Sequence, residues 1–166
     1  MKVRFELLIC FSILVLTGSG CNSKAPLPDN NIPDIGIRPE QMNTKVRLAA
    51  PEGWNTFKID DEVILTLELV TEDQVVFPSG YGARLFIYQN DHWLEINNDM
   101  KYPKGEILVQ HHDRNDPVIE SAGLAPLLPD PNKPVTVRMI LIGHIYRGGK
   151  VTSEKTASYI DVRLKP

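Results

Sequence analysis

A period-two alternation of apolar and polar side chains is the feature that most restricts how this chain folds. Within residues 62–70, four aliphatic side chains fall on one face of an extended chain: Val63, Leu65, Leu67 and Leu69. The closing segment 158–165 repeats the pattern with Ser158, Ile160, Val162 and Leu164. Successive side chains of a strand point to opposite faces, so both segments are predicted to be β-strands with one buried face.

Other segments extend this β pattern along the chain. Residues 135–146 form a longer β-rich run that ends at Arg147-Gly148-Gly149-Lys150, a turn sequence that predicts a hairpin with the closing strand. Shorter strands are expected at 45–49, 55–59, 83–89, 92–96 and 106–110. Roughly seven to eight short strands without helical crossovers predict an all-β fold, an antiparallel sandwich over residues 45–166.

The N-terminus has the pattern of an export signal. Lys2 and Arg4 precede an apolar run at 7–16, and the small residues 17–20 lead to Cys21. Such a run is shorter than the roughly 20 residues that a membrane-spanning helix needs. We therefore expect residues 1–20 to be a signal peptide.

The residues around Cys21 carry a resemblance to a known family. Residues 16–21 (Leu-Thr-Gly-Ser-Gly-Cys) are similar to the lipobox of bacterial lipoproteins, with Ser19 and Gly20 matching and Gly18 standing where Leu or Val is usual. The resemblance implies cleavage before Cys21 and attachment of a diacylglycerol to its thiol. Ordinary signal cleavage nearby, which would leave Cys21 as a free thiol, is the alternative.

Residues 21–44 are expected to be a lipidated cysteine followed by a flexible tether. The segment contains four prolines, several Asn and Asp, and almost no apolar periodicity. Together with the resemblance, this predicts a lipid-anchored protein on the extracytoplasmic side of a cell membrane, in the cell envelope. The lipid bilayer is then a partner through Cys21.

The strand spacing and the terminal hairpin of residues 45–166 resemble bacterial immunoglobulin-like lipoprotein domains. Residues 77–80 (Phe-Pro-Ser-Gly), which follow the strand at 62–70, are also similar to an immunoglobulin-like proteinase-inhibitor family of bacteria. The first resemblance implies a fold, and a fold by itself does not assign a function. The second leaves open an alternative function, the capture of a ligand or a proteinase.

Composition argues against several function classes. The net charge is −3, and Lys and Arg form no basic stripe, which disfavours nucleic-acid binding. Cys10 and Cys21 are too few for a disulfide framework or a four-cysteine zinc site. Neither Ser79 nor Ser121 lies in a nucleophile motif. We expect no catalysis and no cofactor.

A long segment at 111–134 is the candidate binding feature. It has five prolines and no strand pattern, and structureless connections beyond about 12–15 residues are often functional. Its first part, 111–116 (His-His-Asp-Arg-Asn-Asp), is polar. We assign it no metal, because adjacent histidines of a strand point to opposite faces and the glycine and closing glutamate of a calcium loop are absent.

These observations favour a non-catalytic binding or assembly module that docks an envelope protein through this segment. The candidate contact residues are His111, His112, Asp113, Arg114, Asp116, Leu124 and Leu127. The alternative is that the apolar members cap one open end of the sandwich. Tyr88 and Trp93 are further candidate interface anchors, although for Trp93 we expect packing in the core instead.

Overall fold

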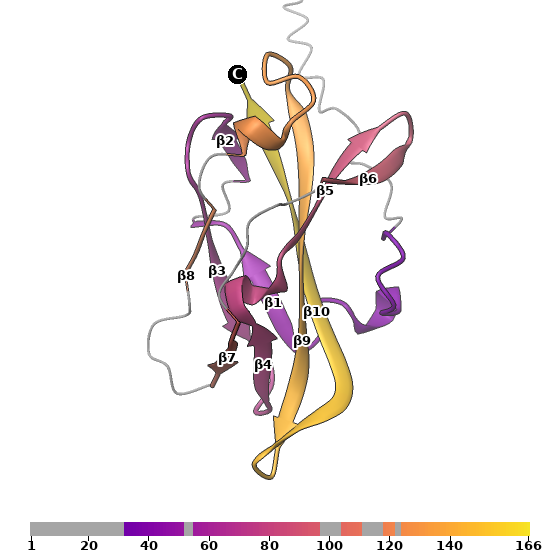
Figure 1. The fold of residues 1–166 in the computed structure, drawn as a ribbon, viewed down its shortest axis with the longest axis vertical. Helices are drawn as coiled ribbons and strands as arrows, with labels where there is room; N and C mark the ends of the chain where they lie inside the picture. Colours follow the sequence, from indigo (N-terminus) through magenta and orange to yellow (C-terminus); the bar gives the residue numbers. More distant parts are fainter. Residues whose placement is uncertain (1–31, 52–54, 97–103, 111–117, 122–123) are drawn as a thin grey trace, which may run out of the picture.

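The chain folds as an all-β sandwich (Figure 1), as the alternation predicts. The structure is a computed structural model that describes residues 32–51, 55–96, 104–110, 118–121 (backbone only) and 124–166. Its strands are β1 (Val46–Ala49), β2 (Thr56–Lys58), β3 (Val63–Leu69), β4 (Gln74–Pro78), β5 (Arg84–Gln89), β6 (His92–Ile96), β7 (Glu106–Val109), β8 (Val118–Ser121), β9 (Val135–Arg147) and β10 (Lys150–Lys165). Among the described residues, the short 3₁₀ turns η3 (Ser79–Gly82) and η4 (Ala125–Leu127) lie between strands, and η1 (Pro39–Gln41) precedes β1.

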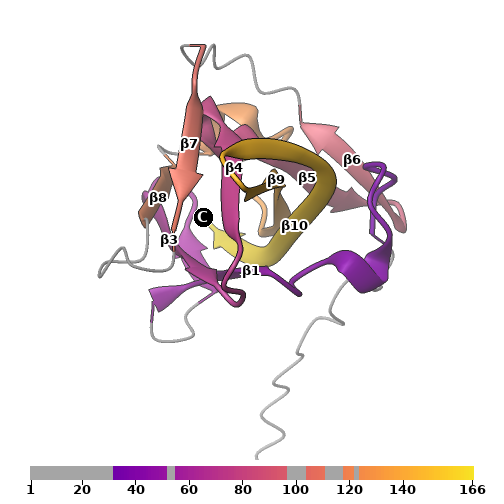
Figure 2. The same cartoon turned by 90° about the horizontal axis from the view of Figure 1, so that it is seen from below.

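The strands form two sheets that face each other across the core (Figures 1 and 2). The smaller sheet has the order β1-β3-β8. The larger sheet has the order β2-β10-β9-β4-β7, and β5, with β6 beside it, also pairs with β9. One edge of β9 is therefore divided between two strands: β4 pairs with residues 144–146, and β5 pairs with residues 137–140.

Gly143 lies where β9 changes partner. A Cβ atom at this position would lie 2.7 Å from Val75 Cγ1 and 2.9 Å from Phe77 Cε1, both on β4. Such distances are far shorter than normal van der Waals contact. Glycine thus allows β4 to pack directly against β9 before η3 leads the chain to β5.

The predicted hairpin is confirmed. β9 and β10 pair antiparallel from Arg147↔Lys150 to Val135↔Leu164, with a bulge between Val151 and Lys155. The turn residues Gly148 and Gly149 both have positive φ, +57° and +78°. This conformation is easy for glycine and costly for other residues, which explains the turn signal in the sequence.

The predicted buried faces are also confirmed. On β3, Val63, Leu65 and Leu67 are fully buried, and on β10 Val162 and Leu164 are too. These side chains belong to one apolar cluster between the two sheets. Burial of apolar surface on this scale is the main favourable term in forming the sandwich.

The strand count and direction differ from expectation. The described residues contain ten strands rather than seven to eight, and the two that the sequence analysis missed are β4 and β8. Val75, Val76 and Phe77 of β4 are all buried, so this strand has no polar face and no alternation. β8 is a four-residue strand inside the proline-rich segment. The sheet is also not purely antiparallel, because β2 pairs with β10 in parallel.

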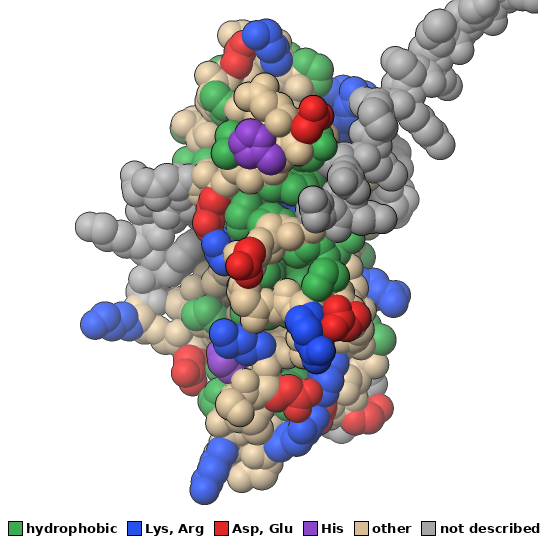
Figure 3. Space-filling view, turned by 90° about the vertical axis from the view of Figure 1, so that its right-hand side faces the viewer, with side chains coloured by type: hydrophobic (Ala, Val, Ile, Leu, Met, Phe, Trp, Pro, Cys, Tyr) green, Lys and Arg blue, Asp and Glu red, His purple; other side chains and the backbone are tan. Residues whose placement is uncertain are grey.

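The expected tether boundary at residue 44 is wrong, because residues 32–44 pack on the domain. This segment, the N-terminal arm, crosses the outer face of the larger sheet. Ile35, Ile37 and Met42 are buried there against Phe86, Ile140 and Ala157. Figure 3 views the molecule from this side, where hydrophobic side chains gather in the middle of the face. Only these three apolar residues of the arm become buried, too few to give a sequence periodicity.

Asn43 joins the arm to the sheet. Its side-chain Oδ1 accepts hydrogen bonds from Ser158 Oγ at 2.6 Å and from the Tyr159 backbone N–H at 3.0 Å. Its own N–H donates to the Ala157 carbonyl at 2.9 Å. The Ser158 hydroxyl oxygen in turn accepts from the Leu48 N–H on β1 at 2.8 Å. The arm, β1 and β10 thus share one buried polar network.

Asn43 also has a φ of +56°, which asparagine tolerates better than most residues. Asn43→Ala removes the hydrogen-bond acceptor and also places a residue at position 43 that adopts a positive φ less readily. We expect this variant to lose about 2–4 kcal/mol in the free energy of unfolding. Asn43→Gly loses the acceptor alone and is expected to lose about 1 kcal/mol less than the alanine variant. Urea unfolding of both variants measures this difference. Equal losses would contradict the role assigned to the backbone conformation.

Candidate functional site

The segment predicted as a contact loop is largely part of the sandwich. Residues 118–121 are strand β8, which pairs antiparallel with β3. Leu124 is 1% exposed, and Leu128 is also buried in the central core. Leu127 is half-buried against the same cluster. Leu124 thus packs in the core as the capping alternative predicts, and Leu127 packs against the same cluster with part of its surface exposed.

The polar members of the prediction lie outside the described residues. These are His111, His112, Asp113, Arg114 and Asp116. Among the described ranges no group of three or more metal-ligating His, Cys, Asp or Glu side chains occurs. In the same ranges, no helix has the length and apolar character to cross a membrane. Cys21 also lies outside them.

A groove opens where β5 separates from β9. The ladder between these strands runs from Arg84↔Ile140 to Ile87↔Val137 and ends there. Both strands continue beyond that pair, β5 to Gln89 and β9 back to Val135. Tyr88 and Gln89 stay paired with β6, which carries them away from β9. The separation leaves a groove of about 460 Å³ between the two strands, a size typical of ligand sites.

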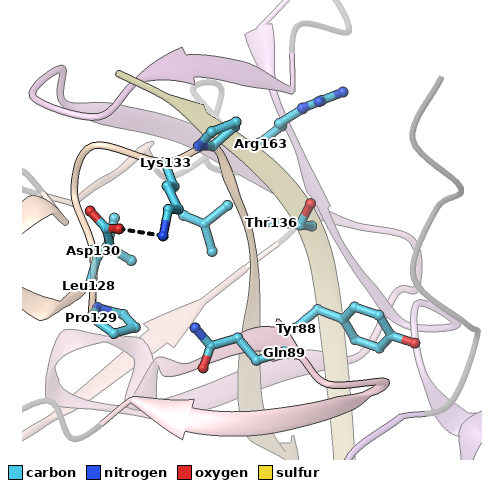
Figure 4. A pocket seen from close by; sticks show the side chains of 10 residues that line it. Tyr88, Gln89, Leu128, Pro129, Asp130, Lys133, Thr136 and Arg163 are labelled. Atoms are coloured by element: carbon cyan, nitrogen blue, oxygen red, sulfur yellow. Dashed lines mark ion pairs between the residues drawn. The ribbon is translucent and has the colours of Figure 1, made fainter. Parts of the chain in front are cut away.

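The groove is built from three parts of the chain (Figure 4). β5 contributes Tyr88 and Gln89, β9 and β10 contribute Val135, Thr136 and Arg163, and the connection after η4 contributes Leu128, Pro129, Asp130, Lys133 and Pro134. Figure 4 shows the hollow between the β5–β6 hairpin on one side and this connection on the other. The walls are mainly apolar, with a few polar groups at the rim, as in many binding sites.

The two cationic groups of the groove differ in their partners. Lys133 Nζ lies 3.0 Å from Asp130 Oδ2, and this exposed pair closes one end of the groove. The pairing lowers the pKa of the Asp130 carboxyl, which also accepts a backbone hydrogen bond from Asn132. Arg163 is half-buried, and no acidic side chain in the described part of the chain forms an ion pair with it. Its guanidinium group is therefore available to an anionic ligand.

Next to the groove, the outer face of the sheet holds a buried arginine. Arg138 is 1% exposed and forms a bidentate ion pair with Asp161, with N–O distances of 2.7 and 2.8 Å. Its guanidinium carbon lies 4.1 Å from the centre of the Trp93 ring and 4.6 Å from that of Tyr159. Trp93 in turn contacts Tyr88 edge-on at 5.2 Å. This stack holds the β5–β6 hairpin against the sheet and so fixes one wall of the groove.

We predict that the Arg138–Asp161 pair is strongly stabilising. Asp161→Asn removes the carboxylate that forms the bidentate pair with this buried guanidinium, and we expect a loss of roughly 3–5 kcal/mol in unfolding free energy. Glu95→Gln is the matched control, because Glu95 also holds an arginine, Arg84, in a bidentate pair but at a more exposed position. Its expected loss is below about 1 kcal/mol. Urea unfolding of both variants measures the contrast, and similar losses would contradict it.

A second charged cluster lies beside the β9–β10 turn, far along β9 from the groove. Arg147 Nε donates to Asp73 Oδ1 at 2.7 Å, and Lys45 Nζ donates to Asp73 Oδ2 at 2.8 Å. Both cations also pair with Glu154, each at 2.9 Å. Hydrogen bonds from Arg147 and then Lys45 hold the pKa of the Asp73 carboxyl well below its usual 3.8. These charges neutralise one another, so we interpret the cluster as structural rather than as a ligand site.

The cluster predicts that the folding stability of the protein decreases at acidic pH. Because the folded-state pKa of Asp73 is depressed, its stabilisation is fully present above pH 3.8 and is lost as the pH falls below that value. Asp73→Asn should therefore be less stable than the wild type at pH 6. The difference in the free energy of unfolding between the two proteins should become smaller below about pH 3.8. Exposed Asp60, which has no ion pair among the described residues, supplies the control Asp60→Asn. Urea unfolding across this pH range tests the prediction. A stability difference between Asp73→Asn and the wild type that does not change with pH would contradict it.

Sequence reasoning singled out parts of the groove without relating them to one another. Tyr88 was a candidate anchor, and Leu128, Pro129, Asp130, Lys133 and Pro134 lie in the predicted segment 111–134, but neither Tyr88 nor this segment was related to Arg163 or to a separation of two strands. Trp93, which was expected to pack in the core, packs against the second apolar cluster, on the outer face of the larger sheet rather than between the two sheets. The groove depends on the residue at which two strands separate, and no local pattern marks that position.

Comparisons with known proteins add little to this site. No protein-family model matches the chain, and no curated protein sequence matches it. The solved structure of Spo0M, a sporulation control protein from Bacillus subtilis, is similar to 74% of this chain, with 12% identity and a TM-score of 0.36. The match covers about half of that protein, 49% of its chain. A similarity this weak carries no argument about fold or function.

Proposed function

We propose that this protein is a lipid-anchored, extracytoplasmic binding module that holds a partner protein of the cell envelope in the groove between β5 and β9. The observation that carries the proposal is the groove itself, a mainly apolar hollow with a half-buried arginine that has no ion-pair partner among the described residues. Such a combination suits recognition better than chemistry, because no His, Cys or Ser side chain of the described residues lines the groove and its carboxylate, Asp130, is engaged by Lys133 and the Asn132 N–H.

The location rests on the N-terminal sequence. The lipobox-like residues 16–21 support attachment of lipid to Cys21 and export from the cytoplasm. Ten residues separate Cys21 from the arm that packs on the domain from residue 32. A chain of that length spans at most about 40 Å, so the proposed anchor would keep the domain close to the lipid surface. The resemblance to immunoglobulin-like lipoprotein domains remains part of this proposal.

The fold supports the groove as a fixed rather than an adaptable surface. One wall is held by the Arg138 stack, and the other begins at the buried Leu128. A preformed site loses little conformational entropy when it binds a partner. The proposed contact surface is therefore the groove, which residues 124 and 127 do not line.

A photo-crosslinking experiment in cells tests the proposal. Gln89, which is exposed at the groove, is replaced by p-benzoylphenylalanine in the full-length chain, and crosslinked proteins are identified by mass spectrometry. The control places the same group at Ile64, which is 38% exposed on β3 in the other sheet. We expect one dominant envelope protein from position 89 that is absent from position 64.

The anchor is tested in the same experiment. Cys21→Ala should release the protein from the membrane fraction and strongly reduce the crosslink, because the partner is then no longer held at the same surface. Identical crosslinks from positions 89 and 64 would overturn the groove as the binding surface. An unchanged membrane fraction for Cys21→Ala would overturn the lipid anchor. Inhibition of a proteinase that is lost on Arg163→Gln would favour the alternative function of proteinase capture.

A further inference from the structure

The groove lies between two strand edges that face each other. On β9, Val135 and Thr136 pair with Leu164 and Arg163 of β10 on one side, while the β5 ladder on the other side stops at Val137. On β5, Tyr88 and Gln89 pair with β6 on one side and have left the β9 ladder on the other. Strand edges in this state offer backbone N–H and C=O groups to an added strand.

From this arrangement we infer that the partner segment held in the groove is an extended peptide that lies as an added strand between β5 and β9, with apolar and acidic side chains in alternation. The inference rests on the proposed function and specifies its ligand. Main-chain hydrogen bonds to the two edges would supply affinity, and the side chains would supply specificity.

The alternation follows from the two faces of the groove. Leu128 and Val135 belong to or pack against the core between the sheets, so they form the inner face. Tyr88, Thr136 and Arg163 lie on the outer face, which they share with Trp93 and Asp161. Successive side chains of a strand point to opposite faces. Every second residue of the peptide would therefore meet Leu128 and Val135, and the residues between would meet the outer face.

The charge of the ligand follows from the outer face. Arg163 is its half-buried cation, and the neighbouring Asp161 carboxylate already forms both of its short ion-pair bonds with Arg138. At the rim, Lys133 is offset by Asp130. A carboxylate of the peptide beside Arg163 would complete a charge-assisted pair, whereas an ammonium group there would meet repulsion.

Binding of synthetic peptides tests this inference on the full-length chain in detergent micelles. The probes are dye-labelled heptapeptides that alternate valine with glutamate, with lysine or with glutamine, and the readout is fluorescence anisotropy. We expect the valine–glutamate peptide to bind at least about tenfold more tightly than the valine–lysine peptide. A block peptide of the same composition, with all valines before all glutamates, is expected to bind weakly, and so is a version with alternate amides N-methylated.

Arg163→Gln is expected to weaken the glutamate peptide about tenfold and to leave the glutamine peptide unchanged. Lys165→Gln is the matched control, because Lys165 lies two residues further along β10, is exposed and does not line the groove. Urea unfolding confirms that both variants are folded. Equal affinity of the glutamate and lysine peptides, or no effect of Arg163→Gln, would overturn the acidic specificity.

The outcomes separate this inference from the proposed function. Undiminished binding of the N-methylated or block peptide would overturn the added strand. If no peptide binds while the crosslink from position 89 persists, the groove holds a partner of another chemistry, and this inference alone is wrong. If the glutamate peptide binds and no crosslink forms in cells, the inferred class of ligand is supported and the proposed envelope partner is overturned.

Discussion

The antiparallel ladder between β9 and β10 is the interaction on which the rest of the structure depends. These two strands pair along most of their length; β2, β4 and β5 attach to their free edges, and β7 and β6 attach in turn to β4 and β5. β4 and β5 share the free edge of β9, while β2 and the N-terminal arm share that of β10. Because the hairpin joins residues close in sequence, it costs little loop entropy and can support the more distant pairings.

The division of the β9 edge has a direct consequence for the candidate site. β4 must leave β9 near Gly143 so that β5 can join it, and β5 in turn leaves after the Ile87↔Val137 pair. The first residues of β9, Val135 and Thr136, thus have no neighbour on that side within the ladder. An edge of this kind inside a sheet is unusual, because exposed strand edges promote unwanted pairing. The proposed peptide strand would pair with this edge and fill the groove between β5 and β9.

Two polar side chains, one half-buried and one fully buried, hold the outer layer in place. Asn43 fixes the arm to β10, and Arg138 holds the Trp93 ring of β6 against the sheet. Asn43 acts through its Oδ1 and Arg138 through its bidentate pair with Asp161, both within the fold, so we assign neither a chemical role. They act instead as positioning groups, since the arm sets where the chain leaves the domain towards Cys21 and the Arg138 stack sets one wall of the groove.

The sequence by itself determined the fold class and most of the strands. Alternation identified β3 and the second half of β10, and Gly148-Gly149 identified the hairpin, because burial on one face and positive φ both leave local marks. It did not reveal β4, which is buried on both faces, or the packing of residues 32–44, whose burial depends on a distant sheet. The groove was also decided only in the tertiary structure. Arg163 and Tyr88 are 75 positions apart in the chain, and they line one groove only because two strands separate at a particular pair.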